Sequence, residues 1–139
     1  MVTNLFNQTP AARDFGYCTV DVLRKKITFT DGGKTVQVGA VPEGGLVIGG
    51  GAFVTTAFNG TTPTLNVGHA DSPTPDPDAF ATALVISALG YIALDELAAV
   101  TNTKPTKERT ITATPALTGA TAGELEVIVL VANQHEGVK

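Results

Sequence analysis

The residues best suited to chemistry lie in a segment rich in proline and aspartate, Gly68 to Asp78. It contains His69, Asp71, Asp76 and Asp78. Carboxylate oxygens that lie close together in sequence are typical ligands of Ca²⁺. The spacing Asp-x₄-Asp-x-Asp, with prolines in between, matches no familiar metal loop, and each proline fixes the backbone and removes a hydrogen-bond donor. We therefore interpret the segment as an irregular, solvated turn and expect no metal site.

Nucleophilic catalysis requires a nucleophile, a base and a group that orients the base. The histidines are His69 and His135, and the serines, Ser72 and Ser87, lie in the proline-rich segment and in an apolar run. Cys18 is the single cysteine, which excludes an intrachain disulfide and is typical of a buried small side chain. There is no Gly-x-Ser-x-Gly motif and no phosphate-binding loop. We expect a protein that is not an enzyme and holds no cofactor.

Composition narrows the class of protein further. The chain has 139 residues, 43% hydrophobic and 16% charged, with a formal net charge of −4. This length predicts one domain with one core. The charged fraction is below the roughly 25% typical of soluble domains. Either partners cover part of the surface, or the surface is polar without charge because it is rich in Thr, Asn and Gly.

Two classes of partner are not expected. Arg24-Lys25-Lys26 is the only basic cluster, so the chain lacks the positive footprint that nucleic-acid binding needs. The longest apolar stretch, 79–94, is too short and too interrupted to span a bilayer. Residues 1–14 lack the pattern of a signal peptide. We expect contact with neither nucleic acid nor membrane.

Short strand patterns separated by turn residues run along most of the chain. Alternation and β-branched residues predict strands at 15–23, 27–30, 35–41, 46–48, 52–58, 64–67, 110–114 and 124–132. Asn59-Gly60 is a strong turn sequence, and Gly49 to Gly51 are expected to interrupt the strand pattern as a bend or bulge between strands. Residues 79–100 fit either helix or strand. The pattern predicts an all-β fold, a single antiparallel β-sandwich or jelly roll.

The core of this sandwich is expected to include Val54, Leu65, Val127 and Val129. The last strand, 124–132, carries one apolar face, whereas its other face begins with glutamates and continues with Ile128 and Leu130. Such a strand either lies between two layers or presents its second face to another subunit. We expect Ile128 and Leu130 to be partner contacts. An aspartate at either position would then cost several kcal/mol, because an unpaired carboxylate resists desolvation.

Residues 1–13 are interpreted as an extended N-terminal arm that precedes a sandwich domain of residues 14–139. The arm has no strand or helix period, and Leu5 and Phe6 have no local apolar residues to pack against. It is either a frayed terminus or a segment that orders when it docks on a neighbouring subunit. For a protein that assembles we favour docking, with Leu5 and Phe6 as contact residues.

Three runs carry a resemblance to a known group of proteins. They are Val41 to Gly60, with Ala-Phe-Asn-Gly at its end, Thr64 to Asp71, with Leu-x-Val-Gly, and Pro77 to Thr82. Together they resemble small virion proteins of tailed bacteriophages, and Thr112 to Glu124 is similar to the way such domains end. The resemblance covers roughly residues 36–131, and Gly49 to Gly51 depart from it.

Within that group the size, the arm and the lack of fibre repeats look most like capsid cement, or decoration, proteins of podophage type. The resemblance implies a jelly roll on the outer capsid surface that stabilises joints between capsomers and has no catalytic residues. It implies the major capsid protein and further copies of the chain, as a dimer or trimer, as partners. It also implies a place in the virion, with assembly in the host cytoplasm. Alternatives are another virion module, such as a head-fibre base, tail or receptor-binding domain, and a carbohydrate-binding module.

Overall fold

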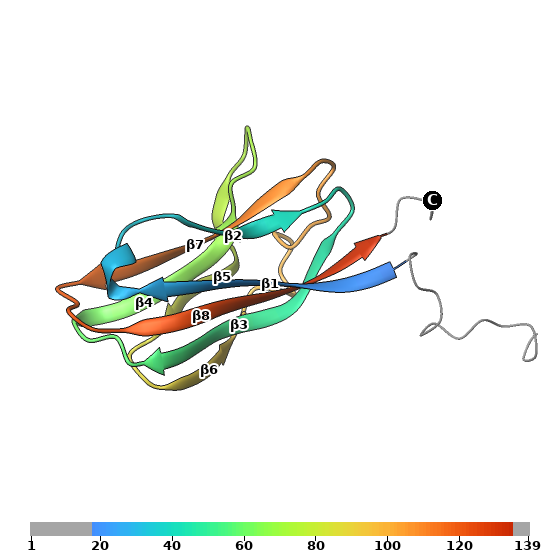
Figure 1. The fold of residues 1–139 in the computed structure, drawn as a ribbon. Helices are drawn as coiled ribbons and strands as arrows, with labels where there is room; N and C mark the ends of the chain where they lie inside the picture. The colour runs from blue at the N-terminus through green and yellow to red at the C-terminus, as the bar shows by residue number, and fades with distance from the viewer. Residues whose placement is uncertain (1–17, 135–139) are drawn as a thin grey trace, which may run out of the picture.

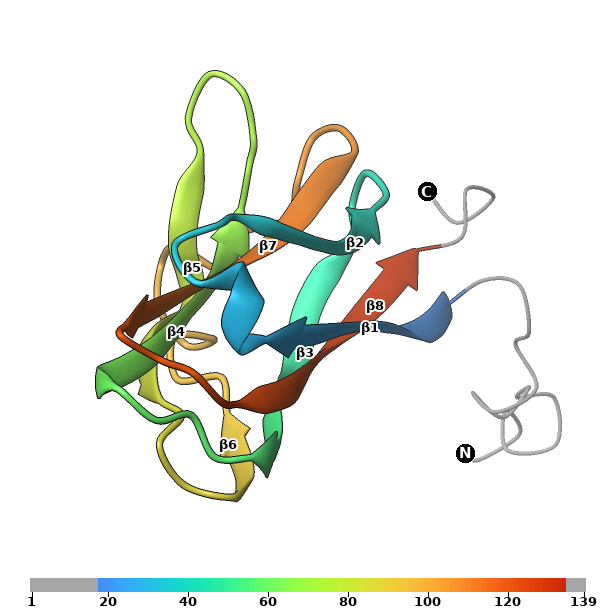
Figure 2. The same cartoon turned by 60° about the vertical axis from the view of Figure 1, so that its left-hand side comes forward.

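The computed structural model describes residues 18–134 of the chain. Within this range eight strands form two four-stranded antiparallel sheets, which pack face to face (Figure 1 and Figure 2). The first sheet has the order β1-β8-β3-β6 and the second the order β2-β7-β4-β5. The predicted all-β antiparallel sandwich is confirmed. The division into an arm (1–13) and a domain (14–139) stays a prediction, because the arm lies outside the described residues.

The strands span most of the described chain. Their bounds are β1 (Cys18–Thr28), β2 (Val36–Val41), β3 (Leu46–Thr56), β4 (Thr61–His69), β5 (Asp76–Val85), β6 (Gly90–Ala93), β7 (Arg109–Thr118) and β8 (Glu124–Gln134). Pairing is nested along the sequence: β4 pairs with β5, β3 with β6, β2 with β7, and β1 with β8. Further ladders join β8 to β3 and β7 to β4, and these complete the two sheets.

The core lies between the sheets and is built from the inward-facing residues of both. All four residues predicted to be buried are there, because Val54, Leu65, Val127 and Val129 are each 1% exposed or less. Phe80 is the largest side chain among those fully buried. In the described part of the chain no helix is long and apolar enough to cross a membrane.

Of the bend or bulge predicted at Gly49 to Gly51, the structure has a bulge, but it lies within one continuous strand rather than between two strands. β3 runs through all three glycines, and its register against β8 shifts between Val47 and Gly49. Gly50 has a φ of +117°, and a Cβ atom there would lie 2.1 Å from the backbone oxygen of Ile128. The glycines therefore allow a β-bulge within a continuous strand, in which the backbones of β3 and β8 approach closely.

Residues 79–100 and the proline-rich segment each contribute residues to strands. The former contribute most of β5 and all of β6, so the helical alternative is wrong. The irregular segment predicted for Gly68 to Asp78 is shorter than expected, since β4 extends to His69 and β5 begins at Asp76. Pro77 lies within β5, which tolerates it because β5 is an edge strand with one unpaired side.

The bulge gives a first testable prediction. Gly50→Ala adds a backbone clash to an unfavourable φ and should lower the free energy of unfolding by more than about 4 kcal/mol. Gly90→Ala is the matched control, because Gly90 has a φ of +118° but nothing within 4 Å of the added Cβ. The control should lose only the backbone strain, about 1–3 kcal/mol. Equal losses for the two variants in urea unfolding would contradict the close approach at Gly50.

Candidate interaction surface

Among the described residues both sheets have an uncovered outer face, and that of the first sheet gathers most of the exposed large apolar side chains. Opposed residues of an antiparallel pair share a face, so the register fixes which side chains lie there. Along β8 the inward side chains are Leu125, Val127, Val129 and Val131, and the outward ones are Glu124, Glu126, Ile128 and Leu130. The inward set is buried, whereas the outward set is half-buried. Ile128 and Leu130 therefore face away from the core.

Apolar side chains continue from β8 onto its neighbours on this face. Val22 of β1 opposes Leu130, and Phe53 of β3 opposes Tyr91 of β6. Val20 and Ile48 extend the set. We call the apolar stripe the group Val20, Val22, Ile48, Phe53, Tyr91, Ile128 and Leu130. The five members on β1, β3 and β6 are each between 46% and 59% exposed, which is unusual for large apolar residues gathered on one face.

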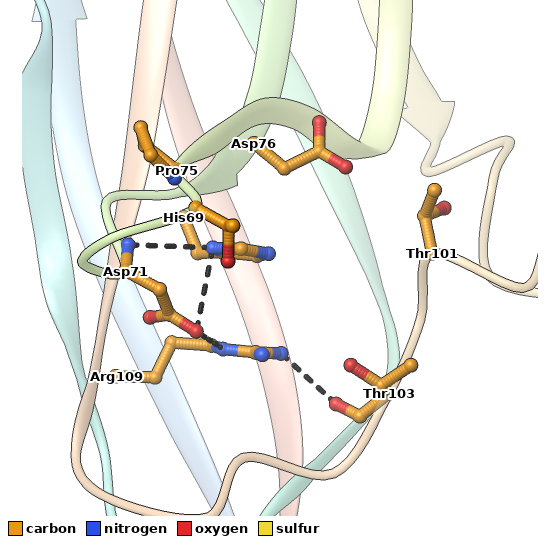
Figure 3. A pocket seen from close by; sticks show the side chains of 8 residues that line it. His69, Asp71, Pro75, Asp76, Thr101, Thr103 and Arg109 are labelled. Atoms are coloured by element: carbon orange, nitrogen blue, oxygen red, sulfur yellow. Dashed lines mark hydrogen bonds and ion pairs between the residues drawn. The ribbon is translucent and has the colours of Figure 1, made fainter.

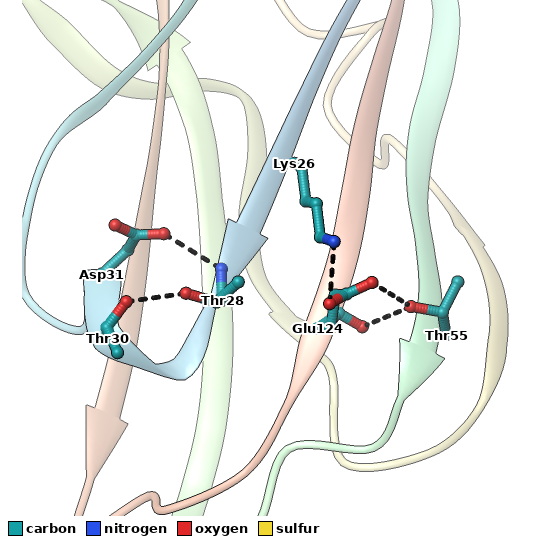
Figure 4. Close-up of polar contacts among 6 residues, drawn as sticks. All are labelled: Lys26, Thr28, Thr30, Asp31, Thr55 and Glu124. Carbon is teal, nitrogen blue, oxygen red and sulfur yellow. Dashed lines mark hydrogen bonds and ion pairs between the residues drawn. The ribbon is translucent and has the colours of Figure 1, made fainter.

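The other end of the same face is ionic. Lys26 Nζ lies 3.0 Å from Glu124 Oε2, and Arg24 pairs with Glu126. Figure 4 shows Lys26 and Thr55 approaching Glu124 from its two sides, with the Thr55 hydroxyl 3.2 Å from the Glu124 backbone oxygen. Exposed ion pairs of this kind contribute about 0–1 kcal/mol each. They make the end of the face near Thr28 and Glu124 ionic on β1 and β8, whereas Phe53 of β3 opposes Glu126 and places apolar surface beside these charges.

β1 ends at the ionic end of the face, where a 3₁₀ turn at Phe29–Asp31 redirects the chain toward the second sheet. Figure 4 shows the Thr28 N–H donating to the Asp31 carboxylate, at 3.0 Å, and the Thr28 and Thr30 hydroxyls in contact. These bonds satisfy polar groups that the strand ladder no longer pairs. The turn therefore marks the end of β1 and of the outer face of the first sheet.

Sequence reasoning found two members of the stripe and missed the others. The assignment of Ile128 and Leu130 as partner contacts stays a prediction, and Leu5 and Phe6 lie outside the described residues. Val20 and Val22 were missed, although they are alternate residues with Arg24 and the sequence alone therefore places all three on one face of a strand. Phe53, Tyr91 and Ile48 carry no such signal, because only the sheet topology brings β3 beside β8 and β6 beside β3.

A second feature is a polar cluster at the end of β4, where two of the four predicted chemical residues meet an arginine. His69 ends β4, Arg109 begins β7, and both side chains are buried. Arg109 Nε donates to Asp71 Oδ2 at 2.8 Å, and Arg109 Nη1 donates to the backbone oxygen of Thr103 at 2.9 Å. The Asp71 N–H donates to His69 Nδ1 at 3.4 Å (Figure 3).

Arg109 was not singled out from the sequence. It could have been found from the alternation of the strand, because Arg109 stands two residues before Ile111 and four before Ala113, which are both buried. Asp76 lines the same depression of about 310 Å³ as His69 and Asp71. Asp76 also hydrogen-bonds with Asp78, and this raises the pKa of the Asp78 carboxyl.

Electrostatics explains what the cluster does. Asp71 neutralises the buried guanidinium of Arg109, and Arg109 ties the β4–β5 turn to the segment that precedes β7. Burial, followed by the positive charge of Arg109, lowers the pKa of His69. Among residues 18–134 no three His, Cys, Asp or Glu side chains gather into a metal-binding set. We interpret the cluster as a structural arrangement that holds the β4–β5 loop in place, rather than as a catalytic one.

The chain is similar to known proteins in its structure but not detectably in its sequence. No protein-family model and no curated protein matches the sequence. A chain of the cyanophage Pam1 capsid asymmetric unit superposes with a TM-score of 0.63 at 21% identity, covering 94% of this chain and 97% of that one. A chain of the Ralstonia phage GP4 capsid superposes with a TM-score of 0.61 at 20% identity, covering 91% and 90%.

A third match is a chain of the acidic stable capsid structure of Helicobacter pylori bacteriophage KHP30. Its TM-score is 0.60 at 13% identity, and the alignment covers 84% of this chain and 90% of that one. The fold is one found in bacteriophage capsids. Because each alignment covers most of both chains, the likeness extends over the whole sandwich, and the matched chains are of about the same length.

The two faces of β8 give a second prediction. Val129→Asp puts a carboxylate into the core and should unfold the protein or lower the free energy of unfolding by more than about 4 kcal/mol. The neighbouring Leu130→Asp puts the same group on the half-buried outer face and should cost about 1–2 kcal/mol. Thermal melts of the two variants would test this, and similar losses would mean that the outer face is as buried as the core.

The lowered pKa of His69 gives a third prediction. The unfolded chain binds a proton at His69 near pH 6.5, whereas the folded chain does so only at lower pH. Stability is therefore present above that pH and lost as pH falls below it, by at most about 1.4 kcal/mol per pH unit. His69→Gln should flatten the dependence of Tm on pH between about 6.5 and 5. Thr118→Gln, at an exposed position without a titrating group, is the control and should keep the wild-type slope, and equal slopes in all three proteins would contradict the assignment.

Proposed function

We propose that this chain is a structural protein of a bacteriophage virion that binds the outer capsid surface and stabilises joints between capsomers. The carrying observation is the end-to-end likeness to chains of about the same length in three phage capsids. The nested strand pairing supports assigning the sandwich to the jelly-roll type, which capsid proteins use widely. Its partners would be the major capsid protein and further copies of itself, in a virion assembled in the host cytoplasm.

The apolar stripe supports this role physically. A cement protein needs no chemistry, and it must add buried area across weak joints. Exposed apolar surface on one sheet face offers such area, at about 25 cal/mol per Å² removed from water. Repetition over a symmetric shell multiplies a modest gain at each joint. The ionic end of the face orients the contact rather than adding much affinity.

The arm would add a second contact. Leu5 and Phe6 could each contribute about 1.5–3 kcal/mol when buried on a shell, before the cost of ordering the segment. Under this proposal the sandwich docks through the apolar stripe, and the arm reaches a neighbouring subunit. Neither contact requires a cofactor or a catalytic group.

A carbohydrate-binding module is the second candidate, favoured by one observation. Phe53 and Tyr91 are cross-strand neighbours on the outer face and are 46% and 55% exposed. Exposed aromatic rings side by side can stack against sugars as well as against a protein surface. Binding of the purified protein to free glycans, lost in Tyr91→Ala, would favour this candidate over capsid binding.

Co-sedimentation with undecorated capsids tests the proposal and gives a fourth prediction. The wild-type protein should pellet with shells, and Leu130→Asp should bind at least about tenfold more weakly because it places a charge in the contact. Thr118→Asp is a matched control, since Thr118 is exposed at the end of β7 in the second sheet. Deleting residues 1–13 should leave Tm nearly unchanged and weaken pelleting. A wild-type protein that stays in the supernatant would refute the function, and full binding by the truncated chain would refute only the role of the arm.

A further inference from the structure

β1 is an edge strand, and the backbone on its open side could pair with another strand. Among the described residues it pairs only with β8, and Figure 1 shows it at the margin of the first sheet. It is eleven residues long, twice the length of an average strand. Long edges expose backbone N–H and C=O groups that can pair with another chain, and proteins usually shorten, cover or charge them. How β1 handles its open edge is therefore informative.

Two charges on β1 lie on the side that faces the second sheet. Asp21 opposes Val131 and Lys25 opposes Val127, so both share the face of the buried core residues, yet both are exposed at the rim. Inward-pointing charges on an edge strand commonly block pairing. Here the charges have opposite signs and stand two residues before and two residues after Leu23. That symmetry is what a two-fold contact between identical strands requires.

We propose that two copies of this chain form a dimer by pairing their β1 strands antiparallel about a two-fold axis at Leu23. In this register Asp21 of each copy opposes Lys25 of the other, which gives two symmetric ion pairs on one face. Leu23 meets Leu23 of the second copy on the axis. The first sheets of the two copies would join into one continuous sheet across the contact.

Other registers of the β1–β1 pairing either place like charges opposite each other or form no ion pair. Opposed residues must share a face, so the axis can move only from one β1 residue to the next. Centred on Arg24, the pairing opposes Arg24 to itself, and centred on Asp21 it opposes Asp21 to itself. Centred on Lys25, it opposes Lys25 to itself and Arg24 to Lys26. Centred on Val22, it leaves Asp21 opposite Leu23 and forms no ion pair. The Leu23 register alone matches opposite charges without a like-charge contact.

The surroundings of Leu23 fit a contact centre. Leu23 is half-buried and packs on β2, where a Cβ added to Gly39 would lie 3.0 Å from Leu23 Cδ2. It also packs against the core but remains partly exposed, so part of its side chain is accessible to a symmetric partner. On the outer face, Val22 would oppose the aliphatic stem of Arg24, which can cover it while keeping its charge in water. Arg24 is already paired with Glu126, so the dimer gathers no unbalanced positive charge there.

This inference deepens the self-association within the proposed function, selects a dimer over a trimer, and does not depend on capsid binding. Its test uses the purified full-length chain without capsids. Sedimentation equilibrium at low salt should show a wild-type dimer. Asp21→Lys creates two Lys–Lys contacts and Lys25→Asp creates two Asp–Asp contacts, so each variant alone should dimerise at least about tenfold more weakly.

Rescue distinguishes this register from a general charge effect. An equimolar mixture of the two single variants restores both opposite-charge contacts, and so does the double variant Asp21→Lys/Lys25→Asp. Both samples should recover wild-type dimerisation. Glu43→Lys and Lys107→Asp make the same changes in net charge at exposed loop positions and should leave the dimer unchanged. In a Cys18→Ser background, Leu23→Cys should form a disulfide-linked dimer, whereas Val22→Cys and Arg24→Cys should not.

Three results would overturn the proposal. A wild-type chain that remains monomeric up to about 1 mM would mean that Asp21 and Lys25 only blunt the edge, or that another segment of the chain covers it. A dimer that tolerates both single charge reversals would lie on another surface. A dimer that both reversals weaken but that neither mixing nor the double variant restores would exclude the Leu23 register.

Discussion

Strand β8 hydrogen-bonds to β1 on one side and to β3 on the other, and both sheet faces depend on this placement. Its inward valines fill the centre of the core, opposite side chains of the second sheet. Its outward residues set the character of the exposed face, with glutamates at one end and Ile128 and Leu130 at the other. A shift of one residue in its register would exchange these two sets. The bulge between Val47 and Gly49, together with the close backbone approach of β3 to β8 at Gly50, helps to fix that register.

The surface follows from the same constraint. Because β8 lies in the interior of its sheet, apolar residues of β1 and β3 lie beside its outward side chains, and β6 extends the set from the far side of β3. No single strand carries the stripe, so it exists only in the assembled sheet. β1 lies at the margin of that sheet, where the backbone N–H and C=O groups on its open side must be paired or protected. One sheet therefore presents two kinds of contact: a face suited to burying area and an edge suited to ordered pairing.

The sequence was sufficient to predict features that depend on local alternation and turn chemistry. Leu125, Val127 and Val129 alternate without interruption, and Asn59-Gly60 marks a turn, so the strand class and much of the core followed. Gly49 to Gly51 were interpreted as a bend or bulge between two strands, and the continuity of the strand through them could not be predicted, because local sequence does not distinguish a loop from a bulge at glycines. The difference lies in Ile128 of another strand. Residues 79–89 were ambiguous because their buried positions are not strictly alternate.

The polar cluster shows the same limit. His69 and Asp71 were visible in the sequence, but their partner Arg109 is supplied by a distant strand, and the resulting arrangement fastens a loop instead of binding a metal. Ile128 and Leu130 were found because they break the pattern of their own strand. Their neighbours on other strands could be identified only once the strand order was known.

The nested pairing has a consequence for how the chain reaches its fold. Arg24 and Glu126, which pair across β1 and β8, are 102 residues apart in sequence. The β4–β5 hairpin can form early because its strands are close along the chain, whereas the outermost pair must close a loop of almost the whole domain. During synthesis β1 emerges before the other seven strands, and its ladder partner β8 emerges after them. The first sheet can therefore be completed only after all eight strands have been made, and until then the β1 backbone remains open to other partners.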